Sequence, residues 1–231
     1  MGFFVQVSSS GTPAAGARLC ADPMTASTHP PFLEALKRGP LVFDGAMGTQ
    51  LYERGYFITR SFDEANLARP ELVLEIHRDY LAAGAQILET NTFGANRALL
   101  SRYGAQDRLL QINRAGVRLA REAAEGMAAD RAAGLMLAPA GAAWVAGSVG
   151  PTGLMLAALT DERKRALADT FKEQIEALLE EGVDLLVLET FISAAEIEAA
   201  LAAARALFDG PIVAQMSFSE ERQAIDGFPP A

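Results

Sequence analysis

Apolar residues recur at helical spacing in three stretches of the chain. The first covers residues 70–83, with a proline suited to the first helical turn and a glycine directly after the last periodic position. The second covers residues 160–182, from a threonine cap to a glycine. The third begins at Ser193, where Glu196 completes a capping box, and ends at a turn at Asp209-Gly210. Three amphipathic helices are predicted.

Short apolar runs alternate with these helices and predict buried β-strands. They cover residues 41–43, 85–92, 144–148, 183–190 and 211–218. Each run is apolar in its body and polar or glycine-rich at its carboxyl end, where α/β barrels and doubly wound sheets place their ligands. The alternation indicates an α/β fold with a parallel sheet and helices outside it. The pattern alone leaves the barrel and the doubly wound sheet equally open.

Two of these strand ends carry candidate ligand groups. The first leads into Asp44 and Gly45, a carboxylate beside a residue that permits close approach of the backbone to a ligand. The alternative is an aspartate that only caps a turn. The second leads into Thr90, one of several adjacent hydrogen-bonding side chains that need either a ligand or a structural network.

Glu189 follows four apolar residues, and an unpaired buried carboxylate is strongly unfavourable. We therefore expect it to have a cationic partner, which is either a ligand or an arginine of a neighbouring unit. His77 falls on the apolar face of the first helix and is expected either to pack in the core or to support a ligand-binding residue, rather than to bind a ligand itself. The glycine-rich residues 147–153 offer backbone amides for a phosphate, although such turns are common for geometric reasons.

Composition narrows the class of protein. The formal net charge of −9 argues against nucleic-acid and membrane partners, and 50% hydrophobic residues suffice for a buried core in 231 residues. Cys20 is the only cysteine, which excludes an intrachain disulfide. Residues 1–30, rich in Gly, Ser, Ala and Pro, are expected to be disordered, and the uncharged residues 132–160 to form barrel interior rather than a membrane span. A cytoplasmic enzyme is expected.

Six motifs in register resemble the homocysteine S-methyltransferase family, and the resemblance covers Pro40 to about Gly227. Within the family, the sequences of these motifs are most similar to those of the homocysteine-binding domain of cobalamin-dependent methionine synthase and of fusions with methylenetetrahydrofolate reductase. The motifs are Asp44-Gly45-Ala46-Met47-Gly48-Thr49, Arg69-Pro70-Glu71 with Ile76-His77, Glu89-Thr90-Asn91-Thr92-Phe93-Gly94-Ala95-Asn96, Ile112-Asn113, Gly147-Ser148-Val149-Gly150-Pro151 and Leu188-Glu189-Thr190.

The resemblance implies a (β/α)8 TIM-type barrel, of which residues 31–231 would form an incomplete part with about the first five β/α units. It also implies that Asp44 and Glu189 hold the amino group of homocysteine, while Gly45 and Thr90 help to fix its amino-acid end. No catalytic or metal-binding residue is assigned within the chain.

In this family three cysteines hold Zn²⁺, one after the sixth strand and an adjacent pair near the C-terminus. The present sequence lacks that set, so the chain alone is expected to be inactive and to bind no stoichiometric zinc. The implied partners are homocysteine, a methyl donor (cobalamin, folate, a sulfonium or betaine) and a missing C-terminal segment or a second chain. The alternatives are a non-catalytic remnant or binding module, and a phosphate-binding barrel.

Overall fold

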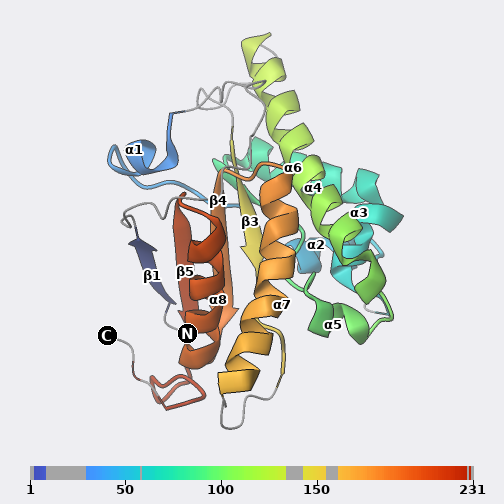
Figure 1. Ribbon diagram of the computed structural model, residues 1–231. Helices are drawn as coiled ribbons and strands as arrows, with labels where there is room; N and C mark the ends of the chain where they lie inside the picture. Colours follow the sequence, from blue (N-terminus) through green and yellow to red (C-terminus); the bar gives the residue numbers. More distant parts are fainter. Residues whose placement is uncertain are drawn as a thin grey trace.

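The computed structural model describes residues 3–8, 30–57, 59–133, 143–154, 161–227 and 229 (Figure 1). These residues form one five-stranded sheet in the order β1-β5-β4-β3-β2. Its strands are β1 (Phe3–Ser8), β2 (Ile87–Glu89), β3 (Trp144–Val149), β4 (Leu185–Phe191) and β5 (Ile212–Ser217).

Strands β2 to β5 are parallel and lie side by side in chain order. The first predicted strand is reduced to a single parallel bridge, between Phe43 and Ile87, on the other side of β2. A parallel sheet without a reversal of strand order is the arrangement of a β/α barrel, whereas a doubly wound sheet has such a reversal. The predicted α/β class is confirmed, and the strand order favours the barrel.

The predicted helices form. Helix α4 has the expected limits, Pro70–Ala83, and Gly84 ends it with a left-handed φ of 107°. The expected cap Thr160 lies outside the described residues. Ser193 caps the third helix, but only half of the predicted capping box forms, because the Glu196 carboxylate accepts from Thr152 instead. The other helices are α1 (Phe32–Leu36), α2 (Met47–Glu53), α3 (Ala65–Ala68), α5 (Arg97–Ser101), α6 (Leu109–Ala132), α7 (Asp161–Glu180) and α8 (Ala194–Leu207), with 3-10 turns at Phe62–Glu64 and Gln106–Arg108.

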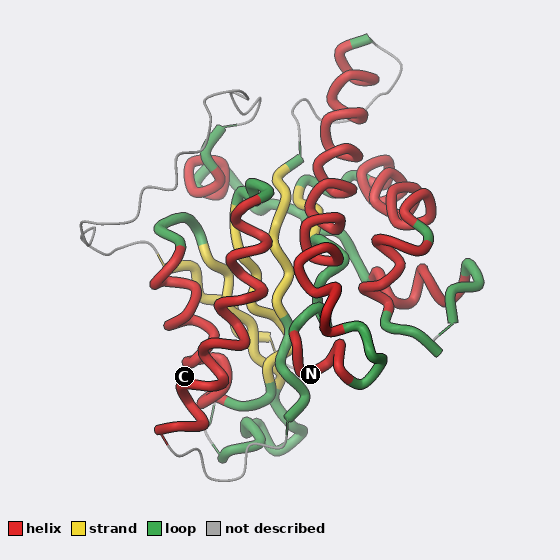
Figure 2. Tube along the Cα trace, turned by 45° about the vertical axis from the view of Figure 1, so that its right-hand side comes forward, coloured by secondary structure: helices red, strands yellow, loops and turns green. Residues whose placement is uncertain are grey.

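Buried side chains alternate along the strands between two cores. On β4, Leu186 and Leu188 pack toward the outer helices, where Phe171 of α7 is fully buried. The intervening residues Leu185 and Val187 belong to the second core, which the short helix α1 helps to close. This period of two is what a parallel strand with both faces covered requires. Figures 1 and 2 show α6, α7 and α8 lying along one side of the sheet.

The N-terminal segment differs from the expectation. Residues 3–8 form β1, which pairs antiparallel with β5 from Phe3 opposite Ser217 to Ser8 opposite Ile212, so disorder throughout residues 1–30 is wrong for this segment. The sequence Phe-Phe-Val-Gln-Val-Ser is rich in aromatic and β-branched residues, and the edge of β5 offers unpaired backbone groups. The surrounding Gly, Ser, Ala and Pro obscured this short β-prone run. The remainder of the extension, up to residue 29, lies outside the described residues.

Within the described parts of the chain, no helix combines the length and the apolar character needed to cross a bilayer. The uncharged stretch that raised this question contains β3, whose six residues are all buried. Its residues 134–142 and 155–160 lie outside the described residues.

Candidate functional site

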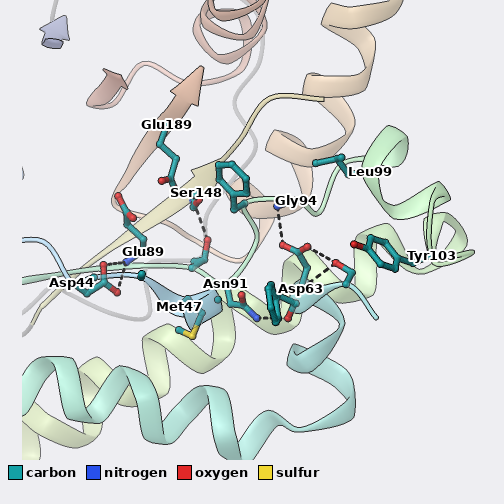
Figure 3. Close-up of a pocket in the computed structure, with 17 residues that line it drawn as sticks. Asp44, Met47, Asp63, Glu89, Asn91, Gly94, Leu99, Tyr103, Ser148 and Glu189 are labelled. Carbon is teal, nitrogen blue, oxygen red and sulfur yellow. Dashed lines mark hydrogen bonds between the residues drawn. The ribbon is translucent and has the colours of Figure 1, made fainter. Parts of the chain in front are cut away.

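A cavity of about 470 Å³ opens where the parallel strands end (Figure 3). The strand ends, the loop after Phe43 and the turn around Ser61 all contribute to it. This is the edge at which α/β barrels bind ligands. The residues that line it are Asp44, Gly45, Ala46, Met47, Gly48, Ser61, Phe62, Asp63, Glu89, Thr90, Asn91, Phe93, Gly94, Leu99, Tyr103, Ser148 and Glu189.

Asp44 is fixed by its neighbour strand. Its backbone N–H donates to Ile87 O at 3.0 Å, and both of its carboxylate oxygens lie 3.1 Å from the Glu89 backbone N–H, which donates to them. The Asp44 side chain is only 2% exposed. Burial raises the pKa of this carboxyl to about 7, the charge of Glu189 adds to the rise, and the Glu89 amide opposes it. Asp44 is therefore poised to change its ionisation near neutral pH.

Glu89 at the end of β2 is a second buried carboxyl. Figure 3 shows its side chain turned toward Glu189. Burial raises the pKa of Glu89 to about 9, and the charges of Glu189 and Asp44 raise it further. At neutral pH this side chain holds its proton in the absence of a nearby cation.

Glu189 faces the cavity from the end of β4, on the same side of the strand as Leu185 and Val187. The pairing of β4 with β5 shifts register between Leu188 and Phe191, and Thr190 has a φ of 60°, which is rare for a β-branched residue. The Ser148 hydroxyl donates to the Glu189 carboxylate at 2.5 Å. Burial raises the pKa of Glu189, and the Ser148 hydrogen bond opposes that rise. Side chains alternate along β4, with Leu186 and Leu188 toward the outer helices, so the Glu189 carboxylate lies on the opposite side.

Thr90 and Gly45 complete the set predicted from the sequence. The Thr90 hydroxyl accepts from the Ser148 backbone N–H at 3.0 Å and lies 2.6 Å from the Thr92 hydroxyl, which itself donates to Ser148 O. The Thr90 hydrogen is therefore committed to Thr92, and a single lone pair remains for a ligand. At Gly45 a Cβ atom would lie 3.0 Å from the Tyr80 ring, so only glycine fits without displacement.

Asp63 lines the far end of the cavity and was not predicted. Its carboxylate accepts from the Gly94 backbone N–H at 2.9 Å and from the Ser61 hydroxyl at 2.5 Å. Burial raises the pKa of this carboxyl. In the sequence, Ser61 and Glu64 are spaced as the capping box that they form here, which signals a helix start and says nothing about a cavity.

The charge of the cavity is one-sided. Among the residues that the structure describes, four carboxyl side chains line it, and no lysine, arginine or histidine does. We refer to the three that meet at the strand ends, Asp44, Glu89 and Glu189, as the carboxylate cluster. Negative charges on these three carboxyls would repel one another in a buried site, so the cluster favours a cationic ligand.

The glycine-rich loop does not form a free phosphate cradle. The Gly150 N–H donates to Phe93 O at 3.0 Å, and the Thr152 N–H and hydroxyl both donate to the buried carboxylate of Glu196. Amides already bound to protein acceptors beside a carboxylate are unsuited to an anion. The geometry thus argues against the phosphate-binding alternative.

The zinc implied by the resemblance does not fit the residues present. The sequence contains one cysteine, Cys20, which lies outside the described residues. Among the residues that the structure describes, no group of three or more His, Cys, Asp or Glu side chains is placed to hold a metal ion.

Fold and site together define an α/β barrel protein with a buried carboxylate cluster at the ends of its strands, and the comparisons identify its family. The homocysteine S-methyltransferase family model matches residues 41–231. The chain is 38% identical over 174 residues to homocysteine S-methyltransferase of Escherichia coli, covering 71% of this chain and 54% of that protein. It is 32% identical over 179 residues to methionine synthase of Mycobacterium leprae, covering 75% of this chain and 14% of that protein.

Solved structures agree with this assignment. The metallated form of the E. coli homocysteine methyltransferase MmuM superposes with a TM-score of 0.71 at 30% identity, covering 87% of this chain and 71% of that one. The apo form gives a TM-score of 0.67 and 68% coverage of that chain. The chain belongs to the homocysteine S-methyltransferase family. It spans about half the length of the E. coli relative and 14% of the M. leprae one.

Proposed function

We propose that this chain forms the homocysteine-binding part of an enzyme that methylates the homocysteine thiol to give methionine. Asp44 and Glu189 hold the ammonium group of the substrate, while Gly45 and Thr90 flank its amino-acid end. The observation that carries the proposal is the carboxylate cluster, beside which the described part of the chain places no cationic side chain in the cavity lining. An α-ammonium group relieves the repulsion within the cluster and restores the ionised forms of its carboxyls.

The cluster suits an amino acid better than a bare cation because its neighbours are polar but neutral. The Thr90 hydroxyl keeps a lone pair toward the cavity, and the Ser148 hydroxyl holds the Glu189 carboxylate in one orientation. Hydrogen bonds from an ammonium to fixed carboxylates are directional as well as strong. They would hold the α-carbon in place and leave the thiol free to point toward the methyl donor, which is the positioning that a direct displacement requires.

The remaining parts of the proposal concern partners. A methyl donor is the second substrate, and family relatives include a metallated form. Bound zinc would supply a thiolate at neutral pH. Since this sequence has a single cysteine, we propose that zinc ligands come from a segment or chain outside these 231 residues. The acidic composition favours the cytoplasm over an association with membranes or nucleic acids.

Removing the amino group from the ligand tests the proposal. Calorimetry with the full chain should show L-homocysteine binding about 10- to 100-fold more tightly than 4-mercaptobutanoate, which lacks only the α-amino group. This difference in affinity should vanish in the double variant Glu189→Gln with Asp44→Asn, because neither replaced side chain carries a negative charge that could favour the ammonium group. Equal binding of the two ligands by the unmodified chain would reject the carboxylate cluster as the amino-group site.

A further inference from the structure

A buried histidine lies directly behind the carboxylate cluster. His77, on the inward face of α4, is fully buried, and its Nδ1 lies 4.0 Å from Asp44 Oδ2. Neither imidazole nitrogen has a hydrogen-bond partner among the described residues. A neutral imidazole always carries one N–H, and a buried N–H without an acceptor is unfavourable. The Asp44 carboxyl is the acceptor that stands about one ångström beyond hydrogen-bonding distance.

The same face of α4 also holds the two residues that follow Asp44. Tyr80, three positions along the helix from His77, donates its hydroxyl hydrogen to Ala46 O at 3.2 Å, and its ring leaves no room for a Cβ atom at Gly45. Residues three apart on a helix lie on one side, so His77 and Tyr80 back the loop together. Helix α4 therefore supports the whole loop from Asp44 to Ala46.

The protonation states of His77 and Asp44, whose Nδ1 and Oδ2 atoms lie 4.0 Å apart, are complementary. Burial lowers the pKa of His77 to about 4, so its imidazole is neutral at neutral pH. Asp44 faces His77 and Tyr80 from α4, Glu89 from β2 and Glu189 from β4, and its pKa is raised to about 7. A protonated Asp44 needs few donors, whereas an ionised Asp44 accepts strongly, and among the described residues its donors are backbone amides, chiefly that of Glu89.

We propose that His77 is a positioning residue, which donates from Nδ1 to the Asp44 carboxylate once that carboxyl ionises and thereby favours binding of the substrate ammonium. The proposal rests on the assignment of Asp44 to the homocysteine site. His77 does not contact the ligand and acts only through Asp44. A small rotation of the Asp44 carboxyl toward α4 closes the gap, and it is the entry of a cation between Asp44 and Glu189 that ionises Asp44.

The pKa of Asp44 in the ligand-free chain tests the proposal without reference to homocysteine. It is read from the ¹³C resonance of the Asp44 carboxyl, identified by its loss in Asp44→Asn. His77→Leu should raise this pKa by about one unit, since the ionised form loses its donor. His77→Asn should restore it, because the asparagine amide nitrogen takes the place of Nδ1. A merely structural role would make both variants alike, and that result, or no shift in His77→Leu, would overturn the proposal.

A second measurement needs no variant of His77. The sequence has only two histidines, His29 and His77, so imidazole ¹⁵N resonances can be assigned with His29→Gln. As pH rises through the midpoint of Asp44, the Nδ1 resonance of His77 should move with that midpoint although the imidazole itself stays neutral. A resonance that stays constant across the Asp44 midpoint would contradict the proposal even if His77→Leu failed to fold.

Homocysteine binding separates this proposal from the function on which it rests. L-Homocysteine should bind His77→Leu about tenfold more weakly than the unmodified chain, and His77→Asn nearly as well as the unmodified chain. Binding that depends on Glu189 but not on His77 would overturn the role of His77 alone. If the unmodified chain bound no homocysteine, the proposed function would fall, while the Asp44 pKa comparison would still decide whether His77 acts on Asp44.

Discussion

Replacing Glu189 with glutamine should weaken L-homocysteine binding about 10- to 100-fold, or roughly 1.5 to 3 kcal/mol, the scale of a charge-assisted hydrogen bond. Glutamine keeps the size of the side chain, and its carbonyl oxygen can still accept from the Ser148 hydroxyl, which donates at 2.5 Å in the present structure. The fold should therefore persist while one of the two charges facing the ammonium is lost. Calorimetric titration of the full chain measures the effect.

The matched control for this substitution is Glu180→Gln on α7. That glutamate forms an ion pair with Arg114 on the outer surface, and 47% of its side chain is exposed. Its replacement should leave homocysteine affinity unchanged. If Glu189→Gln and Glu180→Gln bound homocysteine equally well, Glu189 would have no part in holding the amino group.

The second large effect concerns the pH dependence of stability. The pKa of Asp44 is raised from 3.8 to about 7 in the folded chain, so the folded state binds more protons than the unfolded state between these values. The stability that this group contributes is complete below pH 4 and is lost as pH rises through 7. Without ligand, Asp44 alone should lower the free energy of unfolding by about 2.5 kcal/mol between pH 5 and pH 8.

Asp44→Asn isolates this contribution in urea denaturation. The asparagine resembles the protonated carboxyl, so the stability of the variant relative to the unmodified chain should rise by about 2.5 kcal/mol between pH 5 and pH 8. Asp169→Asn, on the exposed surface of α7, serves as the control because 72% of that side chain is exposed. A free energy of unfolding that rises with pH over this range, or an Asp44→Asn variant that follows the unmodified chain throughout, would refute the electrostatic description of the cluster.

The four residues predicted from the strand ends lie in one part of the molecule. Asp44, Gly45, Thr90 and Glu189 are separated by up to 145 positions in sequence and line one cavity in the structure. That convergence follows from parallel strands, whose carboxyl ends share one edge. The limits of α4 were equally predictable, because proline and glycine mark both of its ends.

Glu89 lines the cavity but was not predicted as a site residue. Like Glu189, it follows apolar residues at a strand end, but only Ile87 and Leu88 precede it within its short strand. The longer apolar run before Glu189 indicated a buried carboxylate there, and the shorter run before Glu89 did not. Whether Glu89 turns into the cavity depends on the three-dimensional register of β2 with β3, which a single sequence does not specify.

Asp63 was missed, and the position of His77 beside Asp44 was not predicted, for a different reason. The contacts that define them join segments without any common periodic pattern: Asp63 meets the amide of Gly94, and His77 approaches Asp44. Periodicity correctly placed His77 on the buried face of its helix. It gave no sign that the imidazole would lie opposite a carboxylate rather than among aliphatic side chains.

Proton release on ligand binding tests the central claim most directly. Near pH 7 the raised pKa values of Asp44 and Glu89 leave the carboxylate cluster partly protonated, and an ammonium among these groups should expel protons. Calorimetry in two buffers of different ionisation enthalpy should show release of about one proton per bound L-homocysteine. L-Methionine, which has the same amino group but no thiol proton, should give the same release. Homocysteine binding without proton release, or with proton uptake, would contradict the account.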